Sequence, residues 1–325
     1  MASALVSVII PCFNASEVLP RAIESVVSQN YGSIEIICVD DGSTDDTLVV
    51  AQRCKHARVV RQSNQGACVA RNRGIAECSG KYVKFLDADD FLLPGAISQQ
   101  VNASKGLSDM AISYGNYIMR SESGEKLVST SLLHKNLLFS VTLQDITTST
   151  PLHRRKLLEY VGGFDANLRR GQEWNLHVRL AAAGVNFVHD ETPIYTYCNF
   201  ENPHRVSRYS SANAEAKYAY KITQVDLTAD ALADPVYVKR AVATLGFARR
   251  LWGAGRDAFR EGEPEIADQC FRKALAYCGD VSEFLPAYYR IPSGLIGRER
   301  FERLISPRTI GKLAARIERG MWRRL

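Results

Sequence analysis

The first hundred residues alternate between short apolar runs and stretches whose apolar positions recur with helical spacing. Continuous β-branched and apolar runs predict strands that are buried on both faces, at 5–10, 34–39 and 82–86, with a weaker strand at 59–60. Helical spacing follows at 18–27 and 66–77, and Ser43 to Asp46 fits a capping box that starts a helix through Ala51. This alternation predicts an α/β fold with a mostly parallel sheet, in which ligands bind beyond the carboxyl ends of the strands.

The pattern changes after the first hundred residues. Residues 110–128 read as a β-hairpin that turns at 121–124, and 147–151 read as a polar loop over the ligand-binding edge. A helix is expected from Trp174 onward, and the last strands are expected at 187–188 and 194–197. From about Ser211 the chain becomes rich in Ala and Arg, and 247–252 and 266–277 predict an αα-hairpin. We therefore expect a first domain over 1–210 and a helical C-terminal extension over 211–325.

Composition favours an intracellular globular protein. The sequence has no charged-then-apolar leader and no apolar run of the ~20 residues that a membrane span needs. None of its eight cysteines is spaced as Cys-x-x-Cys, so they read as small buried hydrophobes in a reducing compartment. We expect a cytoplasmic location.

The net charge of +6 is concentrated at the C-terminus. Residues 290–325 hold ten Arg or Lys and three Glu, a balance of +7, so the rest of the chain is close to neutral. A near-neutral folded domain argues against nucleic-acid binding. Residues 298–325 interleave apolar and basic side chains, as an amphipathic helix at an anionic membrane surface would; a basic helix packed on the domain explains the pattern equally well. Peripheral contact with the inner face of a membrane is therefore an open expectation.

Three carboxylates end the fourth predicted strand. Asp87, Asp89 and Asp90 are separated only by Ala88, and acids this close repel one another unless a cation or several donors neutralise them. Such oxygen ligands suit Mg²⁺ or Mn²⁺, whose other positions water and substrate phosphate fill. The alternative is a solvated acidic turn. Asp41 ends the second strand, so both acidic groups should lie at the same edge of the sheet.

Other common catalytic motifs are missing from the sequence. It contains no Gly-x-Gly-x-x-Gly after the first strand, no P-loop, no His-Glu-x-x-His and no Gly-x-Ser-x-Gly. A nucleotide-type site with a hard metal and one candidate base suits transfer of a group away from a diphosphate. Glu173, in the first turn of its helix, is that base; the alternative is an acid placed there by the helix dipole alone.

Four segments resemble, in order and spacing, the family 2 glycosyltransferases: SVIIPCFN (7–14), VDDGSTD (39–45), ARNRGI (70–75) and FLDADD (85–90). The resemblance is specific over 5–95 and looser to about 208. It implies a GT-A fold and an inverting transfer of a sugar from a nucleotide diphosphate, such as a UDP-sugar, with Mn²⁺ or Mg²⁺. The acceptor would be a hydroxyl of a glycan or lipid-linked glycan in cell-envelope polysaccharide synthesis.

The resemblance also implies roles for individual residues. Asp87 and Asp89 would contact ribose and metal, and the substrate-binding positions would be Pro11, Cys12, Phe13, Asn14, Asp41, Gly66, Arg71, Asp87 and Ala88. The family often has a Glu-Asp pair before a Trp, whose second acid is the general base; here Gln172 and Glu173 stand in that place. The segment from His204 to Ser207 resembles one that closes over the diphosphate, which makes His204 a further candidate metal ligand, or else a surface histidine.

Two other functions remain open at this point. A catalytically silent nucleotide-sugar-binding protein would share the nucleotide site but would lack the base. A nucleotidyltransferase would carry a glycine-rich loop with a basic residue after the first strand, and Pro11 to Asn14 contain neither.

Overall fold

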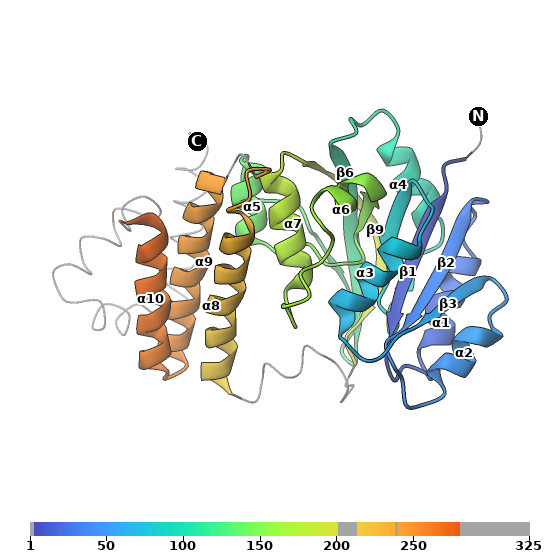
Figure 1. Ribbon diagram of the computed structural model, residues 1–325, viewed down its shortest axis with the longest axis horizontal. Coiled ribbons are helices and arrows are strands. Elements are labelled where there is room, and N and C mark those ends of the chain that lie inside the picture. Colours follow the sequence, from blue (N-terminus) through green and yellow to red (C-terminus); the bar gives the residue numbers. More distant parts are fainter. Residues whose placement is uncertain (1–2, 201–212, 238–239, 280–325) are drawn as a thin grey trace. The chain divides into compact units, whose positions relative to one another are not determined.

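The computed structural model describes residues 3–200, 213–237 and 240–279, which fall into two compact units (Figure 1). The first unit comprises Met1–Ser131 and Asp145–Val206, and the second comprises Leu132–Gln144 and Ser207–Leu325. Each unit is described by itself. The tail predicted at 298–325 lies outside the described residues.

The N-terminal half of the first unit is the parallel sheet that the apolar runs predict. Its strands are β1 (Val6–Cys12), β2 (Ile34–Asp40), β3 (Ala57–Arg61) and β4 (Tyr82–Phe85), in the order β3-β2-β1-β4 with every pair parallel. The side chains of β1 are buried along nearly its whole length, as its continuous apolar character requires.

Three helices connect these strands: α1 (Leu19–Val27), α2 (Thr47–Arg53) and α3 (Ala67–Glu77). Pro20 lies in the first turn of α1, where its missing N–H costs no hydrogen bond. The capping-box prediction for α2 is wrong. The helix begins at Thr47 with Asp46 as an N-cap that accepts no side-chain bond, because the Asp45 carboxylate instead accepts from the backbone N–H of Thr47, at 3.0 Å.

The rest of the sheet contains both parallel and antiparallel strand pairs. The remaining elements of the first unit are β5 (Phe91–Leu92), α4 (Ala96–Ser104), β6 (Ala111–Ser121), β7 (Gly124–Val128), β8 (Pro151–Arg154), α6 (Arg155–Tyr160), α7 (Gln172–Ala182) and β9 (Asn186–Cys198). The order runs β4-β8-β6-β9-β5, and β7 pairs with β6 as the predicted hairpin, with Ser121 opposite Gly124.

Two expectations for this half need correction. The two last predicted strands are one strand, β9. The polar residues between them remain in the strand, and its register against β6 shifts at this point, beside Gly115 and Asn116. The expected polar loop at 147–151 is a turn only up to Thr150, because Pro151 begins β8, and the turn is buried. Ser149 and Thr150 are buried, and the carbonyl oxygen of Thr150 accepts from the Gln100 amide at 2.7 Å.

The second unit is helical. It contains α5 (Leu137–Leu143), α8 (Ala214–Ala231), α9 (Arg240–Arg260) and α10 (Pro264–Cys278). The predicted αα-hairpin is confirmed as α9 and α10, which pack through Trp252 and Phe271 with ring centroids 4.7 Å apart. Gly246 permits the close approach of α5 to α9, because an added Cβ would lie 1.8 Å from the Thr142 hydroxyl oxygen. No helix among the described residues is both long and apolar enough to cross a bilayer.

Candidate active site

The site is built where β1, β2 and β4 end. Because β1 lies between β2 and β4 in a parallel arrangement, the segments that follow the three strands emerge side by side at one edge of the sheet. The predicted meeting of Asp41 and Asp87 at one edge is therefore confirmed. Pro11 and Cys12 end β1, and the buried Cys12 thiol donates to the carbonyl oxygen of Val39 on the neighbouring strand, at 3.4 Å.

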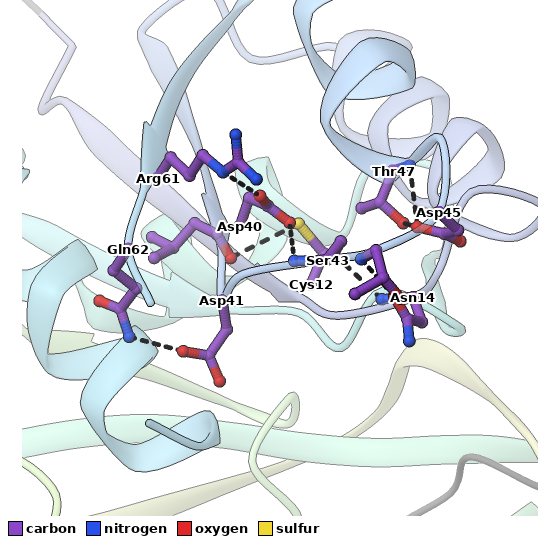
Figure 2. Close-up of polar contacts among 11 residues, drawn as sticks. Cys12, Asn14, Asp40, Asp41, Ser43, Asp45, Thr47, Arg61 and Gln62 are labelled. Atoms are coloured by element: carbon purple, nitrogen blue, oxygen red, sulfur yellow. Dashed lines mark hydrogen bonds and ion pairs between the residues drawn. The ribbon is translucent and has the colours of Figure 1, made fainter. Parts of the chain in front are cut away.

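Hydrogen bonds join the loops that follow β1 and β2 (Figure 2). Asn14 takes a left-handed conformation (φ 47°), and its backbone N–H donates to the Ser43 hydroxyl at 3.0 Å. Its amide oxygen accepts from the backbone N–H of Thr44 at 2.9 Å, while the backbone N–H of Ala15 donates to the Thr47 hydroxyl at 2.7 Å. These bonds fix the loop, and they leave the ring of Phe13 43% exposed beside it.

Asp40 and Asp41 point in different directions (Figure 2). Asp40 is fully buried, accepts from the backbone N–H of Ser43 at 3.2 Å and lies 3.5 Å from the Arg61 guanidinium. The Asp41 carboxylate accepts from the Gln62 side-chain amide at 2.7 Å, and from the backbone N–H groups of Gln65 and Gly66 at 2.9 and 2.8 Å. Gly66 has φ 91° and immediately precedes α3. Asp41 therefore holds the loop between β3 and α3.

Arg71 connects the acid after β4 with the start of α7. Its buried guanidinium donates to Asp87 Oδ1 at 2.7 Å and to Gln172 Oε1 at 2.5 Å, and it lies 5.3 Å from the centre of the Phe164 ring. The Gln172 Nε2 group donates to the carbonyl oxygens of Leu168 and Arg169 at 3.2 and 3.1 Å. The Gln172 amide thus accepts a hydrogen bond through its oxygen and donates through its nitrogen. A carboxylate at this position would place an oxygen against two carbonyl oxygens.

Glu173 is the next residue, in the first turn of α7. Burial raises the pKa of Glu173 to about 7, against the opposing effect of a bond from its own backbone N–H. The negative charges of Asp145 and Asp87 raise the pKa further, and the positive charge of Arg71 lowers it. A carboxylate that titrates near neutral pH can both accept and release a proton under ordinary conditions.

The turn after β4 separates the three acids by role. Asp90 is buried, and its carboxylate accepts from the backbone N–H of Cys198 at 2.9 Å, which ties the turn to the end of β9. The carbonyl oxygen of Asp89 accepts from Arg21 at 2.8 Å, and Ala88 packs partly buried against the core. Asp90 is therefore part of the framework, and Asp87 and Asp89 are the two acids of the predicted Asp-x-Asp motif in this turn.

These two acids fit a magnesium-like cation. The side chain of Asp87 is 37% exposed, and Arg71 occupies only one of its oxygens. One or two protein carboxylates completed by water and phosphate are the usual surroundings of such an ion. In the described part of the chain, no three His, Cys, Asp or Glu side chains are grouped to hold a metal by themselves. His204 lies outside the described residues.

Sequence reasoning missed three contacts near this site. It did not find Gln62 beside Asp41, and it treated Gln172 as a departure from a motif without finding its bond to Arg71. It also missed the buried pair of His153 and His177, whose Nε2 atoms lie 3.3 Å apart. Gln172 carried a signal, because an amide stood where an acid was expected. None of the eight cysteines forms a disulfide bond, and six of them are buried.

A mixed sheet with flanking helices and an Asp-x-Asp turn at its edge defines a GT-A fold, and solved structures agree in fold. Staphylococcus aureus TarS residues 1–349, in complex with UDP-GlcNAc, aligns with a TM-score of 0.57 at 16% identity, over 84% of this chain and 89% of that one. The mannosyltransferase PcManGT from Pyrobaculum calidifontis, in complex with GDP-Man and Mn²⁺, gives 0.53 at 16% identity, over 92% and 83%.

Sequence comparison identifies the family. The model of Glycosyl transferase family 2 matches residues 7–155. A PGL/p-HBAD biosynthesis glycosyltransferase of Mycobacterium bovis BCG is 31% identical over 185 residues, which are 55% of this chain and 70% of that protein. The Escherichia coli enzyme WfaP, a UDP-Glc:alpha-D-GlcNAc-diphosphoundecaprenol beta-1,3-glucosyltransferase, is 36% identical over 121 residues, 36% of this chain and 48% of its own. The chain belongs to the family 2 glycosyltransferases.

The match to other relatives is partial. The chain spans 27% of an uncharacterized glycosyltransferase of Escherichia coli K12, YibD, and 27% of a chondroitin synthase of Escherichia coli. Membership of this family indicates a glycosyltransferase enzyme.

Proposed function

We propose that this enzyme transfers a sugar with inversion from a UDP-sugar to a hydroxyl group of a glycan or lipid-linked glycan. The names of two similar proteins support this chemistry: WfaP uses UDP-Glc and a diphosphoundecaprenol-linked sugar, and TarS binds UDP-GlcNAc. PcManGT binds GDP-Man, so proteins that share this fold differ in the nucleobase of their donor. An enzyme of cell-envelope polysaccharide synthesis in the cytoplasm, at the inner membrane face, would use such substrates.

The proposed reaction needs one base. The acceptor hydroxyl oxygen attacks the anomeric carbon, the bond from that carbon to the diphosphate oxygen breaks, and the hydroxyl proton moves to the Glu173 carboxylate. The observation that carries the proposal is Glu173 itself: a carboxylate with a pKa of about 7, beside the Arg71–Asp87 pair at the ligand edge of the sheet. An ordinary surface glutamate would be too weak a base for this step.

The binding residues would hold the donor as follows. Phe13 and Asp41 would contact the base, and Pro11, Cys12, Asn14 and Gly66 would form the backbone frame around it. Arg71, Asp87 and Ala88 would lie along ribose and diphosphate. Asp87 and Asp89 would hold Mn²⁺ or Mg²⁺, with His204 as a further candidate, and the ion would supply positive charge to the departing diphosphate.

Glu173→Gln tests the proposal, because it keeps the size of the side chain and removes its basicity. We expect kcat to fall by ~10²- to 10⁴-fold with donor affinity unchanged, as for loss of a positioned base. In the wild-type enzyme, kcat/KM should decrease as the pH falls through about 7, because protonation inactivates the base.

Asp165→Asn is the matched comparison. Asp165 is the nearest alternative acid in the sequence, but its carboxylate accepts from the backbone N–H and the side chain of Asn167, at 2.9 and 3.0 Å. We expect this variant to keep its turnover. If Glu173→Gln transferred sugar at the wild-type rate and Asp165→Asn did not, the base would be Asp165.

A further inference from the structure

The Asp41 carboxylate has little remaining capacity to accept hydrogen bonds. Two carboxylate oxygens offer about four lone-pair positions. Oδ1 already accepts from the Gln62 side chain at 2.7 Å and from the Gln65 backbone at 2.9 Å, and Oδ2 accepts from the Gly66 backbone at 2.8 Å. One acceptor position is left, and it is on Oδ2.

The backbone of Gln62 is fixed so that its side-chain amide can donate to Asp41 Oδ1. It follows β3 directly, and its backbone N–H donates to the carbonyl oxygen of Asp40 at 3.0 Å, which sets its position opposite the end of β2. Figure 2 shows its side chain reaching to one oxygen of Asp41 while the other oxygen points away. The bond to Gln62 is the single contact among these three that comes from a side chain and not from the backbone.

Nucleobases differ in how many donors they present to a carboxylate. The imide of uracil presents one N–H between two carbonyl groups. Guanine presents two adjacent N–H donors, which match the two oxygens of a free carboxylate. With Oδ1 filled, Asp41 can satisfy the single donor of uracil but only one of the two from guanine, and an unpaired donor in a partly buried site is costly.

We infer that Gln62 is a specificity-determining residue that makes the site prefer uridine over guanosine donors, by occupying the Asp41 oxygen that guanine would need. This inference rests on the proposed function, because it concerns the donor site of that reaction. It assigns to Gln62 a role that neither its polarity nor its place after a strand indicates.

Gln62→Ala tests the inference, since alanine donates no hydrogen bond and leaves open the space beside Asp41 Oδ1. Dissociation constants for UDP and GDP would be measured by calorimetry in excess Mn²⁺. The wild-type protein should prefer UDP. In the variant, the ratio of the GDP to the UDP dissociation constant should fall by about tenfold, the effect of one hydrogen bond regained at a charged acceptor.

Gln65→Ala is the matched control. It removes a neighbouring side chain of the same type, whose amide contacts Ser63, but keeps the backbone N–H that binds Asp41. Its UDP-to-GDP preference should equal that of the wild-type protein. Thermal unfolding of both variants would confirm that they fold.

The outcomes separate the inference from the function on which it rests. If Gln62→Ala weakened both nucleotides equally, or changed neither, Gln62 would only support the loop and the inference would be wrong while the proposed function stood. Wild-type protein that preferred GDP would overturn both the inference and the UDP-sugar donor of the proposed function. Wild-type protein that bound neither nucleotide would overturn the proposed function itself.

Discussion

Lys84 is fully buried in β4, and its replacement by methionine should have an effect on stability that depends on pH. Its side-chain nitrogen donates to Gln100 Oε1 at 2.6 Å and to the carbonyl oxygen of Thr150 at 3.4 Å, and in the described residues no acidic side chain forms an ion pair with it. Burial lowers the pKa of Lys84 well below the ordinary value of 10.5. The folded protein therefore holds this side chain as a neutral amine under conditions where the unfolded chain protonates it.

The sign and size of the effect follow from proton linkage. Because the unfolded state binds the extra proton, the free energy of unfolding rises with pH, up to pH 10.5, by about 1.4 kcal/mol for each pH unit above the folded-state pKa. At pH 7 this effect costs at most about 5 kcal/mol of stability, which is the limit for a lysine that is fully neutral at that pH. Methionine removes this cost but leaves the Gln100 oxygen without its donor, a loss of about 1–3 kcal/mol.

We therefore expect Lys84→Met to be as stable as the wild-type protein, or more so, at pH 7, and less stable by about 1–3 kcal/mol near pH 10.5. Urea unfolding at several pH values would measure this, followed by fluorescence of Trp174 in a Trp252→Phe, Trp322→Phe background. Lys81→Met, at an exposed position of the same segment, should show no such crossover. Equal destabilisation by Lys84→Met at every pH would mean that Lys84 is charged in the folded protein.

Three other predictions concern the same unit. Burial lowers the pKa of His177 to about 3, against an ordinary value of 6.5. The free energy of unfolding should therefore decrease as the pH falls from 6.5 towards 3, by up to about 1.4 kcal/mol per pH unit. Urea unfolding at pH 7 and pH 5 would show this, and His177→Gln should reduce the dependence of the unfolding free energy on pH. Gln172→Glu adds a negative charge next to Glu173, so the pKa of that base should rise and the acid limb of the kcat/KM profile should move to higher pH; an unmoved limb would contradict the base assignment. Asp89→Asn should weaken Mn²⁺-dependent binding of UDP in calorimetry while binding in excess chelator stays the same; an unchanged Mn²⁺ dependence would remove Asp89 from the metal site.

The parallel half of the sheet could be predicted from the sequence because every signal there is local. β1 and β2 are nearly continuous apolar runs, and α1, the helix between them, carries one apolar face. β9 was harder. Its polar residues from His189 to Thr192 read as a break between two strands, and only the pairing with β6 shows that a shift of register carries the strand through them. The burial of the turn at 147–150 could not be predicted for a related reason, because its side chains are polar and the hydrogen-bond partners of Thr150 are distant in sequence.

The site divides in the same way between what sequence can and cannot show. Asp41, Asp87 and Glu173 could be proposed from the sequence because carboxylates at strand and helix ends are few. The hydrogen bonds of these acids and of Arg71 could not be predicted, because Gln62, Arg71 and Gln172 show no pairing until the fold brings them within hydrogen-bond distance. Yet these partners set the chemistry. An acid in place of Gln172 would compete with Asp87 for Arg71, and would hold a second negative charge beside Glu173. The neutral amide anchors Arg71 without that charge, which keeps the proposed base titrating near neutral pH, where it can work.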